Sequence, residues 1–457
     1  MRTLAVFVVF LVLAPIHALA EKVGAPVLEA LDQQGEALVV IVYDLEAPVE
    51  NLASPLGRAA IREHSGRILD RLSDASFTLR HRYKAINALA GTITREGLDQ
   101  LLEEPLVRRV DLDVGGQGQL GEAVVLAGFI PVWNAGFTGA GVTVAVLDSG
   151  IDSDHPDLSS SLSGEACFCF DNGAGCCPNG ATTQMGTGSG EDDHGHGTNV
   201  IGVITSDGIV APSGGAPDAD IVSIKVLDEN NSFCCTSDVV AGLDYILTDR
   251  PEVDLVNMSL GTFATFPGNC DTATSFTMAL AAAIDTLWQN GVVSFVATGN
   301  GASGTDMSAP ACVANAVSVG AVYDSDIGGI NFGTCSDATT APDQVTCFSN
   351  SNDTTDLFSP GAPMTSSGLG GGTSTFFGTS QASPLSAACA ALLLDAFPGM
   401  TPTDIENALE DSPTLVTDTT NGLSFPRLDC GDAFDNGPIF TDGFESGDTS
   451  AWSSTVD

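Results

Sequence analysis

Four polar residues of this 457-residue chain have the types and surroundings that nucleophilic catalysis needs. Asp148 ends the apolar run "VTVAVLD", His196 lies in "DDHGHGTNVIG", Asn300 ends "SFVATGN", and Ser380 lies in "FFGTSQASP". Serine becomes an effective nucleophile when a histidine accepts its proton and a carboxylate orients that histidine. An asparagine amide can donate a hydrogen bond to the oxyanion of acyl transfer. Each residue alone is an ordinary turn or loop residue, but together, in the order Asp, His, Ser, they predict acyl-transfer chemistry.

The elements expected around these residues form a parallel β-sheet. Five apolar, β-branched runs are separated by helical stretches such as 275–290, and these runs are 141–150, 219–227, 253–261, 291–300 and 315–322. Continuous apolar strands that alternate with helices indicate an α/β fold, with a parallel sheet covered by helices on both faces. Ligands bind beyond the carboxyl ends of the strands in such sheets. Asp148 and Asn300 each come at such an end, where a site is expected.

A smaller unit is expected before residue 115. Strands are predicted at 37–45 and 106–114, with two more within 77–94, and helices at 54–72 and 95–105. This β-α-β-β-α-β order predicts a ferredoxin-like α+β domain, and an unrelated small α+β domain is the alternative. The Gly-rich segment 115–123 that follows is expected to be turn-like.

The first 20 residues have the features of a cleaved signal peptide. One arginine precedes an apolar run, and the segment ends Ala18-Leu19-Ala20, a small-x-small pattern. A membrane anchor is the alternative, but the run from Leu4 to Leu13 is too short to cross a bilayer. We therefore expect a protein secreted from a bacterium, with no membrane association.

Cysteine usage agrees with export. All 12 cysteines lie at or after residue 167, and an even number in an exported chain indicates disulfides. Cys167, Cys169, Cys176 and Cys177 are close enough in sequence for a metal site, but they lack the Cys-x2-Cys pairs of zinc knuckles. Disulfides are therefore the better interpretation, with Cys389, in an apolar helical pattern, as a candidate buried thiol.

The acidic side chains are distributed unevenly. Residues 21–114 carry 16 acidic and 11 basic side chains, whereas residues 115–457 carry 42 acidic and 3 basic ones. The total formal charge is −43. A surface this negative argues against binding to nucleic acid or anionic membranes. It suits solubility, cation binding or salty surroundings.

The segments "VAVLDSGIDSDHPDL", "DDHGHGTNVIG", "VNMSLG", "VATGN" and "FFGTSQASP" resemble, in order, the successive motifs of the subtilisin-like serine proteases, or subtilases. The resemblance covers residues 135–430 and implies a subtilisin-like fold. It implies Asp148 as the orienting acid, His196 as the general base, Ser380 as the nucleophile and Asn300 as the oxyanion donor. Ser259, Leu260 and Gly261 match the strand that pairs with the substrate backbone.

Several positions depart from the family pattern. The family usually has a second histidine where Asn199 stands, methionine where Gln381 stands, and often histidine where Leu385 stands. None of the three is a triad member, so these departures concern subsite shape and helix packing. Residues 166–190 resemble a cysteine-bearing insertion between the Asp and His motifs.

The resemblance also implies a division of the chain into signal peptide (1–20), inhibitory propeptide (21–114), catalytic domain (115–430) and acidic C-terminal tail (431–457). The expected partners are polypeptide substrates and the chain's own propeptide, and the expected state is a monomer. The resemblance implies that catalysis needs no cofactor. The family often binds structural calcium, and Asp157 in "HPDL" matches a position that supplies a ligand in some members.

Two other functions are considered. A catalytically silent subtilase fold could serve as a binding module, but a complete triad and a propeptide argue against it. An α/β-hydrolase esterase needs a Gly-x-Ser-x-Gly elbow and the order Ser, Asp, His. Ala382 stands at the second glycine position and the order differs, so the secreted endopeptidase is favoured.

Overall fold

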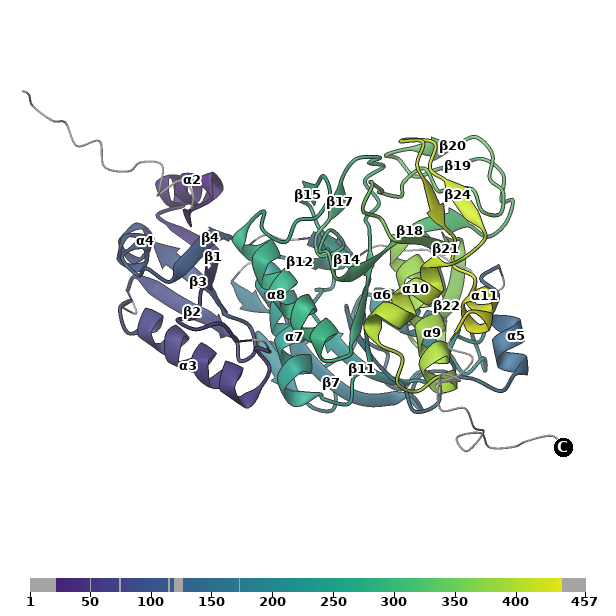
Figure 1. Cartoon of the computed structure of the whole chain (residues 1–457), viewed down its shortest axis with the longest axis horizontal. Coiled ribbons are helices and arrows are strands. Elements are labelled where there is room, and N and C mark those ends of the chain that lie inside the picture. Colours follow the sequence, from purple (N-terminus) through teal and green to yellow (C-terminus); the bar gives the residue numbers. More distant parts are fainter. Residues whose placement is uncertain are drawn as a thin grey trace, which may run out of the picture.

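The computed structural model describes residues 22–49, 51–73, 75–113, 116–118, 126–171 and 173–437. Residues 22–113 form an N-terminal unit, and the later residues form a larger one (Figure 1). The expected signal peptide and residues 438–457 of the expected tail lie outside the described residues. Within the described part, no helix is both long and apolar enough to cross a membrane.

The N-terminal unit has the element order expected from the sequence. Its elements are β1 (Glu36–Tyr43), α3 (Pro55–Leu69), β2 (Phe77–Arg82), β3 (Ala88–Thr94), α4 (Arg95–Leu102) and β4 (Val107–Leu112). The antiparallel sheet has the strand order β2-β3-β1-β4. One further helix, α2 (Ala25–Gln34), precedes them and was not predicted. A proline in its first turn and Gly35, with φ of 81°, mark its two ends.

An eight-stranded sheet organises the larger unit. In spatial order its strands are β10 (Thr183–Met185), β7 (Leu162–Phe168), β11 (Asp220–Lys225), β6 (Thr143–Asp148), β13 (Leu255–Met258), β16 (Val293–Ala297), β18 (Ala316–Tyr323) and β21 (Leu357–Ala362). Every pairing is parallel except that between β10 and β7. All five predicted runs contribute strands. The run 253–261 is divided, because its last part forms β14 (Leu260–Thr262) in a different sheet.

Helices cover both faces of this sheet. Along β6, Val144 and Val146 face a core shared with α6 (His196–Thr205) and α9 (Thr379–Ala396). The alternate residues Ala145 and Leu147 face a core shared with α7 (Thr236–Asp249) and α8 (Ser275–Gln289). This alternation follows from the two-residue period of a strand. The predicted doubly covered α/β sheet is therefore confirmed.

The N-terminal unit packs against α7 and α8. Its strands β1 and β4 contact α8, and Figure 1 shows its sheet beside these two helices. Buried side chains of β1 and β3, including Val40, Val42 and Ala90, belong to the same core cluster as residues of α7 and α8. The two units thus share a continuous apolar interface.

All 12 cysteines are paired. The six disulfides are Cys167–Cys177, Cys169–Cys176, Cys234–Cys235, Cys270–Cys312, Cys335–Cys347 and Cys389–Cys430. The prediction of disulfides over a metal site is confirmed. The prediction of a free thiol at Cys389 is wrong, because this cysteine on α9 lies beside Cys430 of α11 (Cys430–Asp435), a helix whose proximity the local sequence pattern does not reveal.

Candidate active site

Asp148 and His196 are brought together by the end of β6 and the start of α6. His196 Nδ1 lies 2.5 Å from Asp148 Oδ1, and both side chains are buried. The backbone N–H of Ser149 donates to the same carboxylate oxygen at 2.7 Å. A proton held on Nδ1 by the carboxylate leaves Nε2 as the basic nitrogen of the neutral imidazole. This arrangement prepares His196 to accept a proton through Nε2.

Asp192 orders the loop that leads into His196. Its carboxylate accepts hydrogen bonds from the N–H groups of His194, Gly195 and Thr198, and from the hydroxyls of Ser149 and Thr198. Burial alone would raise the pKa of the Asp192 carboxyl, but these hydrogen bonds outweigh it and lower the pKa. Asp192 therefore stays ionised and fixes the backbone on both sides of His196.

His194 and His196, with Asp192 and Asp193 beside them, form a weak sequence signal for a metal site, but in the structure both carboxylates are engaged by other groups. Asp192 is occupied by N–H and O–H donors, and Asp193 Oδ1 lies 2.6 Å from Lys225 Nζ. Lys225 is fully buried, and on β11 it is the strand partner of Asp148 on β6. Its ammonium also donates to the Ser149 carbonyl at 2.7 Å. These acidic residues hold the loop in place instead of coordinating a cation.

Ser380 lies in the first turn of α9 and forms hydrogen bonds with Ser259, which directly follows β13. Its hydroxyl donates to the carbonyl of Ser259 at 3.3 Å, and the Ser259 hydroxyl donates to the carbonyl of Ser380 at 2.5 Å. Asn257 Nδ2 donates to the Ser259 hydroxyl at 3.0 Å, and Ser383 Oγ donates to Asn257 Oδ1 at 2.7 Å. The nucleophile's helix is thus fixed to the strand that precedes β14. The first turns of α6 and α9, which carry His196 and Ser380, lie side by side, because Gln381 Nε2 donates to Asn199 Oδ1 at 2.8 Å.

Asn300 is oriented by the residue that precedes Ser380. Asn300 Oδ1 accepts hydrogen bonds from the backbone N–H and the hydroxyl of Thr379, both at 3.0 Å. Since the amide oxygen is engaged in this way, the Nδ2 group is the part of the side chain presented as a donor. The first N–H groups of α9, including that of Ser380, have no partner within the helix. Asn300 and the start of α9 can therefore supply two donors to one oxyanion.

The expected substrate strand is paired with another part of the chain. In β14, Leu260 pairs with Gly118 and Gly261 with Gln117, in antiparallel register. Their partner strand β5 (Gly116–Gly118) also pairs with β12 (Ser232–Phe233). The short sheet β12-β5-β14 therefore holds an extended segment between two strands of the larger unit, as a peptide ligand added by β-augmentation would be held.

The environment of Asp157 does not fit the calcium ligand suggested by the resemblance. This fully buried carboxylate accepts hydrogen bonds of 2.6–3.1 Å from the N–H groups of Ile209, Val210 and Ala211. Calcium ligands are oxygens that face the cation, whereas these oxygens face N–H donors. Asp157 closes the loop after α6.

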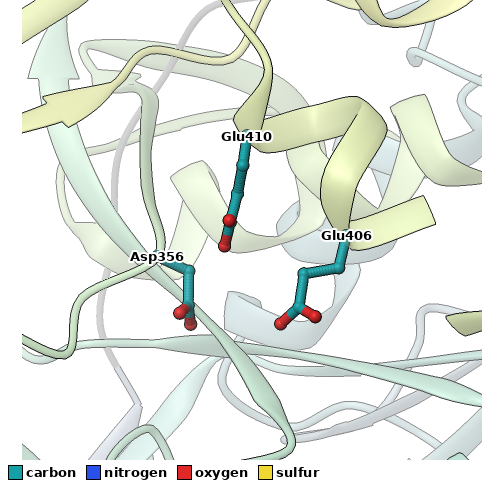
Figure 2. A group of neighbouring side chains, drawn as sticks. All are labelled: Asp356, Glu406 and Glu410. Carbon is teal, nitrogen blue, oxygen red and sulfur yellow. The ribbon is translucent and has the colours of Figure 1, made fainter. Parts of the chain in front are cut away.

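Three carboxylates gather elsewhere, at the start of β21 and on α10 (Pro402–Glu410). Figure 2 shows Glu406 and Glu410 projecting from α10 toward Asp356, and one carboxylate oxygen of each of the three residues lies within 4.8 Å of the other two. Burial, followed by repulsion from Asp356, raises the pKa of Glu406 and of Glu410 to about 7. Burial raises the pKa of Asp356 to about 6. In the described residues, this is the single group of three potential ligand side chains that could hold a metal ion.

Comparisons with known proteins identify the family of this chain. The subtilase family model matches residues 139–432, so the chain belongs to the subtilase family and is a serine-type endopeptidase. Subtilisin E of Bacillus subtilis (strain 168) is 28% identical over 361 residues, which cover 77% of this chain and 82% of that protein.

Two other similar proteins differ in coverage. The minor extracellular protease Epr of Bacillus subtilis (strain 168) is 29% identical over 357 residues, covering 73% of this chain and 47% of its own. A solved cold-adapted subtilisin-like serine proteinase is 26% identical, with a TM-score of 0.47, and the match covers 64% of this chain and 90% of that one.

The sequence did not reveal the supporting residues of the site. Asp192 and Asp193, beside His194 and His196, form a weak sequence signal for a metal site, although in the structure each fixes the loop around His196. Thr379, which orients Asn300, and Ser149, which donates to Asp192, had no signal beyond adjacency to a predicted site residue. For Ser149 and Thr379, adjacency was the one clue available, because their roles depend on contacts with residues 43 and 79 positions away.

Proposed function

We propose that this chain is a secreted endopeptidase made as a preproenzyme, and that it removes its own propeptide. The observation that carries the proposal is the position of β5, which lies immediately after the N-terminal unit and pairs with β14 beside Ser380. A propeptide whose last residues pair with β14 takes the place of a substrate peptide. It therefore blocks the site and also presents a peptide bond to Ser380. The extracellular relative Epr and the apolar segment 1–20 support export.

The proposed reaction follows from the four site residues. Ser380 Oγ turns from the Ser259 carbonyl toward His196, transfers its proton to Nε2, and attacks the substrate carbonyl carbon. Asn300 Nδ2 and the Ser380 N–H stabilise the oxyanion. His196 then gives the proton to the leaving amine, which leaves an acyl-enzyme on Ser380. Water, activated by His196, hydrolyses the ester. Asp148 holds the imidazole throughout, and the mechanism needs no cofactor.

Contacts between the two units support an inhibitory role for residues 21–114. Asp244 of α7 accepts hydrogen bonds of 2.7–2.9 Å from the N–H groups of Lys84 and Ala85. Arg80 forms an ion pair with Asp238, which is also on α7, and its guanidinium lies over the ring of Phe170, 4.3 Å from the centroid. The N-terminal unit thus supplies cations to a surface that has few of its own. We expect the mature enzyme to be a monomer.

Substitution of Ser380 tests the proposal. The Ser380→Ala chain should show no peptide hydrolysis, should not be labelled by a serine-directed phosphonylating reagent, and should stay uncut. Ser386→Ala is the matched control, because Ser386 is also buried on α9 but its hydroxyl donates only to the Ala382 carbonyl of the same helix. Hydrolysis by the Ser380→Ala chain would refute the proposal. Cutting of that chain when expressed alone would refute self-processing.

A further inference from the structure

Asn199 and Gln381 form a direct hydrogen bond between the two helices that begin at the active site. Gln381 Nε2 donates to Asn199 Oδ1 at 2.8 Å, and both side chains are fully buried. Asn199 lies one turn after His196 on α6, and Gln381 immediately follows Ser380 on α9. The bond therefore joins the first turns of the two helices that carry the base and the nucleophile.

The same amide joins a third element. Asn199 Nδ2 donates to the carbonyl and to the hydroxyl of Ser374, both at 3.0 Å. Ser374 belongs to the hairpin of β22 (Met364–Gly368) and β23 (Gly372–Phe376), and its hydroxyl donates to the Ser367 carbonyl across that hairpin at 3.0 Å. Phe376, at the end of β23, packs near His196, with ring centroids 6.3 Å apart.

We propose that Asn199 and Gln381 act as a pair of positioning residues that fix His196 relative to Ser380. This inference rests on the roles proposed for those two residues. Proton transfer needs the imidazole within hydrogen-bond reach of the hydroxyl, and displacements of about 1 Å can cost about 100-fold in rate. A buried bond between the first turns restrains both the separation and the relative rotation of the two helices.

The chemistry of the pair suits this position. Both groups are neutral amides, so the link adds no ionisable group beside His196. Breaking the bond from one side leaves a buried amide unpaired, which costs more than removing both partners. The two departures from the family pattern at these positions thus form one interacting unit, and a substitution at one should depend on the residue at the other.

A double-mutant cycle tests the proposal in the full chain after maturation. Gln381→Met, Asn199→Leu and the double variant should be compared by kcat and KM on a peptide substrate, with active sites counted by phosphonylation. Each single substitution should lower kcat about tenfold or more while KM changes less than about threefold. The double variant should be no worse than the poorer single variant. Additive losses in kcat, or losses confined to KM, would overturn the proposal.

Thr205→Val provides the matched structural control. Thr205 is buried at the far end of α6, and its hydroxyl donates to the carbonyl of Ala219 at 2.9 Å. This variant should lower the thermal midpoint without changing kcat at temperatures well below it. An equal loss of kcat in Thr205→Val would show that general destabilisation explains the effect, and would overturn the proposal.

Gln381→Glu keeps the size of the side chain, and therefore tests the pair even if the apolar variants fail to mature. Only the protonated carboxyl can donate to Asn199 Oδ1, whereas the ionised form cannot. The ratio of its kcat to that of the unsubstituted enzyme should therefore rise as the pH falls. A ratio that is constant with pH would overturn the proposal. Labelling of Ser380 in the unsubstituted enzyme shows separately whether the assignment of the nucleophile holds.

Discussion

The carboxylate of Asp113 accepts a hydrogen bond from the backbone N–H of Ser237, 2.8 Å away, across the boundary between the two units. Ser237 lies in the first turn of α7, whose N-cap residue, Cys235, makes no side-chain cap. Asp111 makes a similar contact of 2.5 Å with the N–H of Ser275, the first residue of α8. Carboxylates at helix N-termini satisfy free N–H groups and interact favourably with the helix dipole.

Removal of the Asp113 carboxylate should weaken inhibition by the N-terminal unit. In the Asp113→Ala chain, the cleaved N-terminal unit should dissociate faster, because hydrogen bonds to charged groups contribute about 1.5–3 kcal/mol. Activity should therefore appear about tenfold sooner after self-cleavage. The time course of peptide hydrolysis after processing measures this. Asp99→Ala is the control, since Asp99 is exposed on α4 and should leave the time course unchanged. Identical release by both variants would contradict an inhibitory role for the contact.

Loss of the Asn300 amide should reduce kcat while leaving KM nearly unchanged. Asn300→Ala removes one donor to the oxyanion, which typically costs about 100- to 1000-fold in kcat. Thr379→Val removes one of the two bonds that orient Asn300 and should have a smaller effect in the same direction. Steady-state kinetics on one peptide substrate distinguish the two. If the kcat of Asn300→Ala falls by less than about threefold, the oxyanion donor lies elsewhere.

The strand register predicts the bond that self-processing cuts. Leu260 pairs with Gly118 and Gly261 with Gln117, and Ser259, which contacts Ser380, precedes Leu260. Residue 119 lies outside the described part of the chain. Ser259 directly precedes Leu260, the partner of Gly118, so we expect Ser380 to cut just beyond Gly118, at the Gln119–Leu120 bond. N-terminal sequencing of the mature enzyme should begin at Leu120. Any other first residue would contradict this register.

Much of the fold was predictable because strands buried on both faces are continuous apolar runs. The strands β6, β11, β13, β16 and β18 all coincide with such runs. The same argument explains why β21 was missed, since its sequence "LFSPGA" contains proline and glycine and lacks the expected composition.

The chemistry of the site was more predictable than its support. Asp148, His196, Asn300 and Ser380 stand in distinctive local motifs, and the structure pairs Asp148 with His196. Asn199 and Gln381 stood out in the sequence as departures from the family pattern, but the bond between them could not be predicted, because it joins residues 182 positions apart. Periodicity and spacing report local structure, whereas such contacts are determined by how the helices pack.

Salt should stabilise the mature enzyme. Its cations are Lys225, Arg250 and Arg427, and each is already paired with a neighbouring carboxylate, namely Asp193, Glu252 and Asp343. Repulsion among the remaining carboxylates is screened as the Debye length falls from about 30 Å at 0.01 M to about 3 Å at 1 M salt.

Thermal unfolding of the mature Ser380→Ala form, which cannot digest itself, measures the effect of salt. The midpoint should rise by about 2 °C or more between low and high sodium chloride. Parallel measurements with calcium and with chelator, both in low salt, separate screening from ion binding. A rise with calcium alone would indicate a bound ion. A midpoint that is the same in all four conditions would contradict the electrostatic argument.

The cluster of Asp356, Glu406 and Glu410 should make stability fall as the pH rises. The pKa is raised to about 6 for Asp356 and to about 7 for each glutamate, above the ordinary values of about 4 expected in the unfolded chain. Between about pH 4 and pH 7 the folded state therefore binds more protons than the unfolded state. The free energy of unfolding contributed by the cluster is greatest below this range and is lost above it.

Neutralising the two glutamates should remove this dependence. The Glu406→Gln/Glu410→Gln variant of the Ser380→Ala form should unfold about 2 °C or more higher than its parent at pH 8, and the difference should vanish or reverse near pH 4. Asp353→Asn/Asp411→Asn is the control, because it removes the same charge from exposed positions on the same two segments. If net charge alone were responsible, the unfolding temperature at pH 8 would rise equally in both variants. A gain confined to the glutamate pair would show that burial and mutual repulsion within the cluster are responsible, and a loss at pH 8 would show that the ionised carboxylates stabilise the fold.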